Sequence, residues 1–483
     1  MHWFCVRQVI VSKWKILILI AMVCIVLRKF LQAPEETNPE EVIHFERALK
    51  NFNEENVTDE RHHSTREEQH FEPVLNAKMF VKSAIYDPRN KTRRVIRVWA
   101  IVAPKAPITY CHIKYQGNET YITAKAFVRV QIDFVPPYCG WLTASILCPV
   151  KGDLIPASVS ISVSQHSVTN SWIPVRTPTY IPPKPNYGIC VKTLEMKGDK
   201  DVTNIVEWFE INKLLGVSKI FIYDTQNVSS KLQSVLHSYE DLGLLVMEPW
   251  QLPVRPLSPT IYKSPVLTPE IKETRKSPSK VQCVQFHAQY LAHMDCMYRH
   301  MDEFSHLAFI DVDEYIIPSG KSLLWKDMFA QIESDPSAKR AASYGFAEAC
   351  FDLTKPANDT SIVVGNSTAN LTTKHYTRLK KFRRKDAVGW HHKSIIKPQF
   401  VTDMFVHEAN EVLRKYKINL YVNDKIGRLH HYRKPCTTKQ SKQKRRKKVV
   451  EKMVEDRIMS KYLDKLKEGM VKTLSDVGGA DSL

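Results

Sequence analysis

Strand-like apolar runs alternate with helical repeats in the part of the chain that begins at Tyr187. Residues 187–194 and 219–224 are predicted strands, and 231–239 is a predicted helix. Another helix is predicted from its N-cap, Asp201, to Gly216, which ends it. This order favours an α/β fold with a mostly parallel sheet, because each helix carries the chain back to start a parallel strand.

A short acidic loop follows the last strand of this series. The apolar run 306–310 leads into Asp311, Asp313 and Glu314. Side chains alternate along an extended backbone, so Asp311 and Asp313 are expected to point the same way. Hard dications such as Mg²⁺ and Mn²⁺ bind oxygen ligands, and the loop therefore predicts a divalent-cation site. Asp224 also ends a predicted strand, so we expect it to face the same crevice.

Other stretches frame this series of strands and helices. Residues 73–184 contain alternating, strand-like sequence such as 121–130, with frequent Pro and Gly, and predict a small β-rich accessory region. Residues 250–280 are rich in proline, which is typical of a functional loop or an insertion. Residues 281–301 are then predicted as a helix that leads into the strand before Asp311.

Residues 16–31 predict a membrane anchor. They are largely apolar, and basic residues such as Lys15 and Arg28 lie near the ends of the apolar run, where long basic side chains reach the membrane interface. A cleaved signal peptide is the alternative. It requires small residues at a cleavage site, and the nearest small residue, Ala33, is followed by Pro34. We therefore favour an uncleaved signal anchor.

Glycosylation sequons and cysteines indicate the compartment of the folded part. Seven Asn-x-Ser/Thr sequons follow the anchor, at Asn56, Asn90, Asn118, Asn227, Asn358, Asn366 and Asn370. Eight cysteines also follow it, an even set that predicts disulfides without fixing their pairing: Cys111, Cys139, Cys148, Cys190, Cys283, Cys296, Cys350 and Cys436. Both features favour a lumenal domain and hence a type II membrane protein.

The predicted organisation has six parts. They are a cytoplasmic tail (1–15), a transmembrane signal anchor (16–31), a polar stem (32–72), the β-rich accessory region (73–184), the α/β domain (185–436) and a basic helical tail (437–483). In the last part, residues 439–448 hold seven basic residues and no acid, which supplies seven of the net charge of +19. In a lumenal protein such a run suits anionic glycans or lipid headgroups better than nucleic acid, which we do not expect as a partner.

A series of short motifs lies between Tyr187 and Pro435. They are Cys190-Val191-Lys192, Glu207-Trp208, Leu215-Gly216-Val217, Ile222-Tyr223-Asp224, Gln285 to Cys296, Phe309 to Tyr315 with Pro318, Lys393 to Pro398, Val406-His407 and His431-Tyr432-Arg433. This series resembles glycosyltransferase family 92. The resemblance implies a GT-A-like fold, a Golgi type II topology and inverting transfer of a sugar, typically galactose from UDP-galactose, onto a glycan.

The resemblance gives the acidic loop a role. In such enzymes the leaving group is a diphosphate, and a metal held by Asp313, with Asp311 ligating it or orienting the ribose, stabilises the developing charge. Mn²⁺ or a similar dication is the expected cofactor. Many GT-A enzymes add a histidine ligand, for which His407 is the first choice and His431 the second. The remaining donor-binding candidates are Asp224, Lys192 and Lys393.

Inversion also requires a general base that removes the proton of the acceptor hydroxyl. Glu348, in a strand-and-turn stretch, is ranked first. Asp386, in a basic loop suited to phosphates, is the second candidate, and Asp352 and Glu408 remain open.

Two other functions fit parts of the sequence. A haloacid-dehalogenase-type phosphatase also uses Asp-x-Asp after a strand, but that motif normally opens its domain, whereas strand-like segments precede Asp311 here. A non-catalytic lumenal glycan-binding protein is the other alternative, although it would leave the metal loop unexplained.

Overall fold

A computed structural model describes most of the chain downstream of residue 69, and all described residues lie within Glu60–Leu483, one compact unit. No helix among the described residues is long and apolar enough to cross a membrane. The predicted cytoplasmic tail, the anchor and most of the stem lie outside the described residues. The structure describes residues 70–104, 107–131, 139–168, 171–181, 183–191, 202–224, 228–254, 256–257, 283–355, 361–364, 367–380, 392–434, 436 and 452–477.

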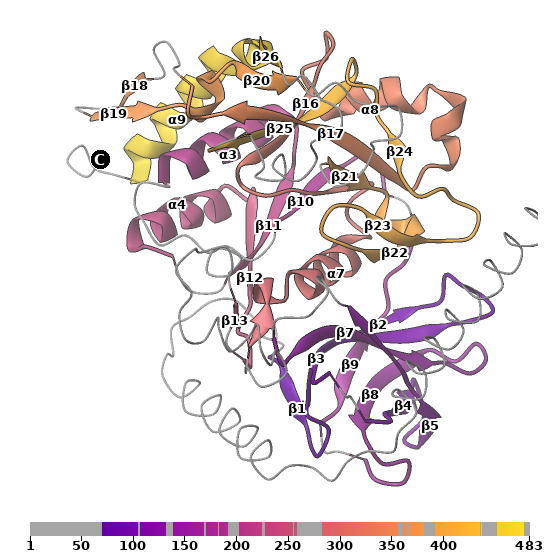
Figure 1. Cartoon of the computed structure of the whole chain (residues 1–483). Helices are drawn as coiled ribbons and strands as arrows, with labels where there is room; N and C mark the ends of the chain where they lie inside the picture. Colours follow the sequence, from indigo (N-terminus) through magenta and orange to yellow (C-terminus); the bar gives the residue numbers. More distant parts are fainter. Residues whose placement is uncertain are drawn as a thin grey trace, which may run out of the picture. The chain divides into compact units, whose positions relative to one another are not determined.

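The residues before Tyr187 form a β-structure, shown in indigo and purple in Figure 1. Side chains alternate between a buried core and the outside, so that Ile113, Val159 and Ile161 pack inward. The predicted strand 121–130 is two strands, because Ala126 leaves the pairing and donates its backbone N–H to Thr109 O. The strand order is β5-β4-β8-β9-β2-β3-β7-β6, with β1 beside β2; the bounds are β1 Glu72–Val74, β2 Met79–Asp87, β3 Val95–Val102, β4 Tyr110–Tyr115, β5 Tyr121–Lys125, β6 Phe127–Gln131, β7 Leu142–Pro149, β8 Pro156–Ser162 and β9 Ile173–Arg176.

The residues from Tyr187 onward form a mixed α/β structure, as predicted for this part of the chain. Its largest sheet has the order β12-β11-β10-β15-β21-β17-β20-β26. The first four strands are parallel, whereas β21 is antiparallel to β15 and β17, and β17 is antiparallel to β20, so the sheet is mixed rather than mostly parallel. Its first half comprises β10 Tyr187–Cys190, α3 Val202–Leu214, β11 Lys219–Asp224, α4 Ser230–Asp241, β12 Leu245–Pro249, β13 Pro256–Leu257, β14 Val284–Gln285, η3 Phe286–Ala288, α7 Gln289–His300 and β15 His306–Phe309.

The second half of this structure inserts strands and hairpins beside the sheet. β25 pairs with both β16 and β17, and β24 also pairs with β17. The remaining bounds are β16 Glu314–Pro318, α8 Trp325–Glu333, η4 Pro336–Arg340, β17 Ser343–Asp352, β18 Ser361–Val364, β19 Ser367–Asn370, η5 Thr372–Lys374, β20 Thr377–Lys380, β21 His392–Ile396, η6 Pro398–Phe400, β22 Val401–Met404, β23 Ala409–Val412, β24 Leu420–Tyr421, β25 Gly427–Arg433, β26 Lys452–Glu455, η8 Ile458–Tyr462 and α9 Leu463–Val477.

The helix predicted over 281–301 is shorter than expected. Phe286, His287 and Ala288 have φ angles of 48°, 54° and 55°, in the left-handed region, so a right-handed helix cannot run through them. Helix α7 starts only at Gln289, and the preceding residues form β14 and this left-handed turn. The prediction failed because non-glycine residues rarely adopt this conformation.

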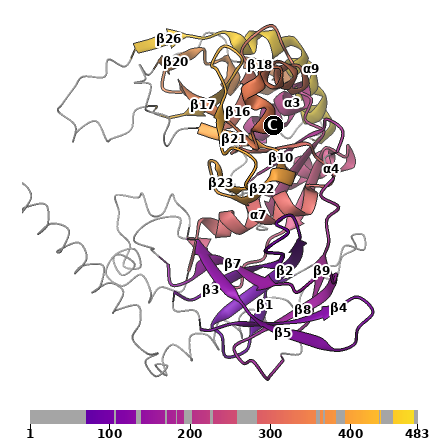
Figure 2. The ribbon, with the colours of Figure 1, turned by 90° about the vertical axis from the view of Figure 1, so that its right-hand side faces the viewer.

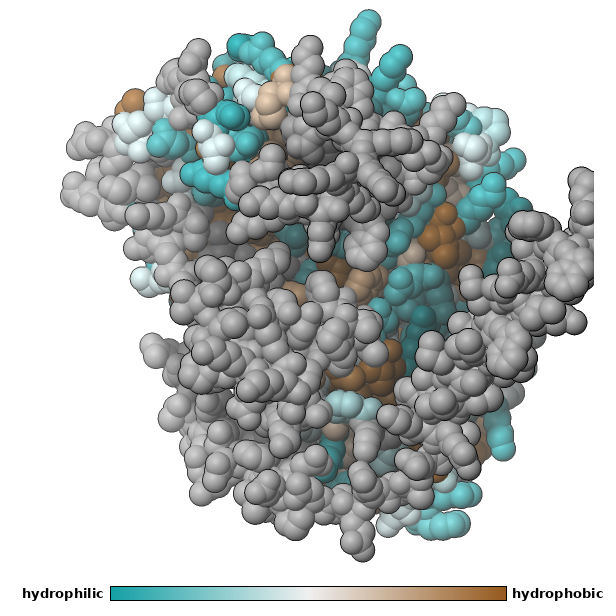
Figure 3. Space-filling model, viewed as in Figure 1, coloured by the Kyte–Doolittle hydropathy of each residue, from teal (hydrophilic) through white to brown (hydrophobic). Residues whose placement is uncertain are grey.

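The described C-terminal residues pack within the same fold. β26 pairs with β20 at the edge of the large sheet, and α9 packs against α3 and α4 (Figures 1 and 2). Leu466, Met470 and Leu474 of α9 are buried. On the face seen in Figure 3, hydrophobic residues reach the surface in a few places between hydrophilic ones.

A disulfide and a buried arginine side chain connect the β-rich region to the α/β region. Cys139 forms a disulfide with Cys283, 144 residues further on. Arg89 of the β-rich region donates to the carbonyl oxygens of Pro398, Gln399 and Val401, at 3.0, 3.0 and 2.8 Å. The two regions therefore share covalent and polar contacts as well as a sequence connection.

Candidate active site

The acidic loop is a closed turn between β15 and β16. Glu314 donates its backbone N–H to Asp311 O, and its Oε2 accepts from the Asp311 N–H, both at 3.0 Å. The indole Nε1 of Trp208, on α3, donates to Glu314 O at 2.9 Å. These bonds fix the backbone of the loop while the side chain of Asp313 stays 52% exposed. Asp313 is thus the loop carboxylate most open to a ligand.

Lys393 neutralises the inner side of the loop. Its Nζ lies 3.1 Å from Asp311 Oδ2 and 3.4 Å from Glu314 Oε2, and its side chain is buried. Burial alone would lower the pKa of Lys393, but the carboxylates of Asp311 and Glu314 outweigh burial and raise it. Burial raises the pKa of Glu314 to about 7 despite Lys393. Lys393 therefore remains a cation that holds Asp311 in place.

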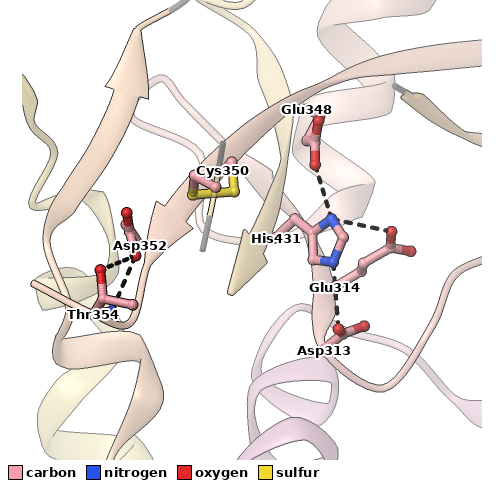
Figure 4. The surroundings of a disulfide bond; sticks show 8 residues. Asp313, Glu314, Glu348, Cys350, Asp352, Thr354 and His431 are labelled. Atoms are coloured by element: carbon pink, nitrogen blue, oxygen red, sulfur yellow. Dashed lines mark hydrogen bonds and ion pairs between the residues drawn. A yellow bond between two sulfur atoms is a disulfide. The ribbon is translucent and has the colours of Figure 1, made fainter. Parts of the chain in front are cut away.

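His431, on β25, faces the outer side of the loop. Its Nε2 lies 3.3 Å from Asp313 Oδ2, and its Nδ1 lies 2.9 Å from Glu348 Oε1 and 3.7 Å from Glu314 Oε1 (Figure 4). Burial lowers the pKa of His431, but the bonds to Asp313 and Glu348 outweigh it and raise this pKa to about 10. Three strands that are distant in sequence thus bring one imidazole and three carboxylates together.

The chemistry of this group suits a divalent cation. Asp313 offers a carboxylate oxygen, and His431 offers an imidazole nitrogen once a bound cation replaces the proton on Nε2. Glu348 on Nδ1 directs Nε2 toward Asp313, as the hydrogen-bond partners of metal-binding histidines do. Among the residues that the structure describes, no group of three or more His, Cys, Asp or Glu side chains surrounds a metal position. Two protein ligands match a cation that completes its shell with substrate phosphates and water.

The other predicted site residues stay predictions. The Nδ1 of His407 faces His392 O at 3.2 Å, and burial followed by Lys393 lowers its pKa to about 4. Asp224 ends β11, but its side chain lies outside the described residues, as do Lys192 and Asp386. Of the predicted set, the structure brings Asp311, Asp313, Lys393 and Glu348 together.

Two residues whose roles the sequence did not reveal sit side by side on α3. Trp208 holds the acidic loop, and Glu207 accepts from the backbone N–H and the hydroxyl of both Thr372 and Thr373. Burial raises the pKa of Glu207. The Glu207-Trp208 motif marked both residues in the sequence. A motif does not show which backbone atoms its side chains bond.

Comparison with known proteins agrees with these observations. The profile described as glycosyltransferase family 92 matches residues 186–471, more than half of the chain. The chain belongs to glycosyltransferase family 92. The match confirms the resemblance found in the motifs and extends beyond Pro435 into the C-terminal residues that pack on α3. The family's name indicates glycosyl transfer.

A relative of this family 92 protein is the beta-1,4-galactosyltransferase galt-1 of Caenorhabditis elegans. The two are 22% identical over 264 residues, which is 53% of this chain and 51% of galt-1. The chain therefore spans about half the length of the relative that it matches.

Proposed function

We propose that this family 92 protein transfers a hexose, with galactose from UDP-galactose as the first donor, onto a glycan or glycoprotein acceptor with inversion. The observation that carries the proposal is the pairing of Asp313 with His431, in the acidic loop that follows the parallel strand β15. Family membership supports glycosyl transfer, and the printed name of galt-1 supports galactose. A GT-A-like fold belongs to the same proposal.

Each residue of the site has a part in this reaction. Asp313 and His431 would hold Mn²⁺ or a similar dication, which supplies Lewis-acid stabilisation of the departing diphosphate. Glu348 keeps the Nδ1 of His431 occupied, so that Nε2 faces Asp313. Lys393 holds the carboxylate of Asp311 in place, and Asp311 would bind the ribose of the donor. His407 stays a candidate for a further ligand, because a backbone carbonyl on Nδ1 is a common partner of metal-binding histidines.

The donor and the metal can be tested together. We expect purified protein with Mn²⁺ to release UDP from UDP-galactose faster than from UDP-glucose, UDP-N-acetyl sugars or GDP-sugars, because a shaped pocket discriminates between sugars. Chelation is expected to lower the rate about 10²-fold or more, since the cation stabilises the leaving group by several kcal/mol. UDP release measured with and without EDTA, and after Mn²⁺ is restored, checks both.

Two results would count against the proposal. One is full turnover in EDTA, which would show that the reaction needs no divalent cation. The other is phosphate release from a generic phosphomonoester without any nucleotide-sugar turnover, which would favour the haloacid-dehalogenase-type alternative.

A Golgi lumenal location, with anchoring by residues 16–31, is part of the proposal. Its support is the four disulfides among the described residues, Cys111–Cys148, Cys139–Cys283, Cys190–Cys296 and Cys350–Cys436, which form in oxidising compartments. Two sequon asparagines, Asn90 and Asn118, are exposed in turns, and each accepts from the Thr two residues on.

For the full-length protein made in cells, we expect N-glycosidase treatment to increase gel mobility, because these sequons reach the lumen. Changing Asn90 and Asn118 to Gln should remove part of that shift. A full-length protein whose mobility is indifferent to the enzyme would contradict the lumenal placement.

A further inference from the structure

Glu408 lies in the turn between β22 and β23, and its carboxylate is half-exposed. The Phe405 N–H donates to Glu408 O at 2.9 Å and closes the turn. The Oε2 of Glu408 accepts from Asn419 Nδ2 and lies 3.4 Å from His392 Nε2. Its side chain is 42% exposed, whereas that of Glu348 is 5% exposed and bound to His431. Glu408 is thus a carboxylate held at one oxygen and open to solvent.

Asn419 is set in an uncommon conformation that aims its amide at Glu408. Its φ is 48°, in the left-handed region that asparagine adopts more readily than most residues. Its Oδ1 accepts from Ser343 Oγ at 2.7 Å, while its Nδ2 donates to Glu408. Both ends of the amide are therefore engaged, which orients the carboxylate of Glu408. Backbone of this kind persists where surrounding contacts hold it, and such positions cluster at ligand sites.

Tyr421 supplies an exposed aromatic ring beside this carboxylate. Tyr421 is 40% exposed, and its ring stands at 80° to the ring of His392, with centroids 5.4 Å apart. It lies over Gly345, where an added Cβ would come within 2.8 Å of the Tyr421 ring, so the glycine makes room for it. Burial and then the charge of Glu408 raise the pKa of Tyr421, in keeping with their proximity.

This cluster adjoins the donor side of the site through one strand. His392 and Lys393 are consecutive on β21, so their side chains point to opposite faces of the sheet. Lys393 bonds Asp311 of the acidic loop, and His392 faces Glu408. In Figures 1 and 2 the β22–β23 hairpin lies beside β21, and Ser394 Oγ donates to His407 O at 2.9 Å. Phe309 of β15 pairs with Ser394 of β21, so both groups start from the end of β21 that lies beside the acidic loop, one on each face of the sheet.

The other carboxylates considered for proton removal are already engaged. Glu348 orients His431, and Asp352 accepts from the backbone N–H and the hydroxyl of Thr354 (Figure 4). No described residue bonds Oε1 of Glu408. An exposed aromatic ring next to a positioned carboxylate and an amide is suited to a pyranose, whose C–H face packs on the ring while its hydroxyls bond the polar groups.

We propose that Tyr421 and Glu408 form the acceptor subsite, in which the acceptor is a pyranose whose reacting hydroxyl bonds the Glu408 carboxylate. The proposal rests on the proposed glycosyl transfer. The hydroxyl oxygen forms a bond to the anomeric carbon of the donor, and the bond from that carbon to the phosphate oxygen breaks. UDP leaves with the bonding electrons, and the proton of the hydroxyl passes to Glu408, which acts as general base.

The test separates donor use from acceptor use in the full-length protein, with Mn²⁺, UDP-galactose and a pool of fluorescently labelled N-glycans. Glu408→Gln keeps the shape of the side chain and is expected to lower kcat for transfer about 10²-fold or more, with the KM for UDP-galactose unchanged. Tyr421→Ala is expected to raise the acceptor KM about tenfold, the loss of a packing contact of about 1–1.5 kcal/mol, and Tyr421→Phe to restore it.

The matched control is Glu411→Gln, on the same hairpin. Glu411 is 49% exposed and pairs with Arg129, so its loss should leave transfer within about twofold of wild type. Transfer by Glu408→Gln at the wild-type rate, or an acceptor KM indifferent to Tyr421→Ala, would overturn the subsite while the enzyme remains a transferase. A wild-type protein that turns over no UDP-sugar would contradict the proposed function itself. Melting temperatures of all variants distinguish lost chemistry from lost folding.

Discussion

Replacing Asp313 with Ala is expected to lower transfer activity about 10³-fold, the largest effect on catalysis that the site predicts. The dication that Asp313 is proposed to hold stabilises the departing diphosphate by several kcal/mol, and each 1.36 kcal/mol changes the rate tenfold. Because the side chain is 52% exposed and bonds only His431 among described residues, the melting temperature should change little. Mn²⁺ titration of the purified variant should show weakened binding in parallel.

The control for this experiment is Asp476→Ala, which removes an exposed carboxylate near the end of α9. Both variants carry the same change in charge, so a common effect would point to general electrostatics. Mn²⁺ affinity and activity that both survive in Asp313→Ala would remove this residue from the metal site.

Replacing Arg89 with Met is expected to cause the largest loss of stability. The guanidinium bonds both oxygens of Asp87 at 2.9 and 3.0 Å, the Tyr298 hydroxyl at 2.7 Å and three backbone carbonyls. The side chains of Arg89 and Asp87 are only 5% and 3% exposed. Losing one member of a buried pair costs about 3–5 kcal/mol, since the other charge stays buried and less compensated.

Thermal unfolding should therefore show a melting temperature lower by about 5 °C or more. The matched control is Arg94→Met, whose partner Asp153 is 90% exposed, and which should melt close to wild type. Equal melting temperatures for Arg89→Met and Arg94→Met would contradict the prediction. They would show that the contacts of Arg89 with Asp87 and the loop at Pro398 add little to stability.

Local sequence patterns predicted the elements whose determinants are local. The strand expected over 219–224 is β11 Lys219–Asp224, and the helix expected over 231–239 is α4 Ser230–Asp241, with Ser229 as its N-cap. In both, a buried apolar pattern and its flanking residues lie within one short stretch. The acidic loop after β15 was also predictable, because a strand and the residues that follow it are contiguous.

The partners of that loop were not predictable in the same way. His431 lies 118 residues from Asp313, and it reaches the loop because β25 inserts between β16 and β17. Pairing of distant strands leaves no local signature, so the sequence named His431 as a second choice but could not show that it lies beside Asp313. The disulfide pattern and the pairing of β26 with β20 depend on the same long-range contacts.

The Cys139–Cys283 bond has a consequence for the order of synthesis. Cys139 lies within the loop that the Cys111–Cys148 bond closes, and its own partner is made 144 residues later. The nascent chain thus presents Cys111, Cys139 and Cys148 together before Cys283 exists. A free thiolate attacks a disulfide within its reach, so Cys139 can exchange with the Cys111–Cys148 bond until Cys283 is made. The yield of active protein should accordingly depend on a disulfide isomerase in the cell that makes it.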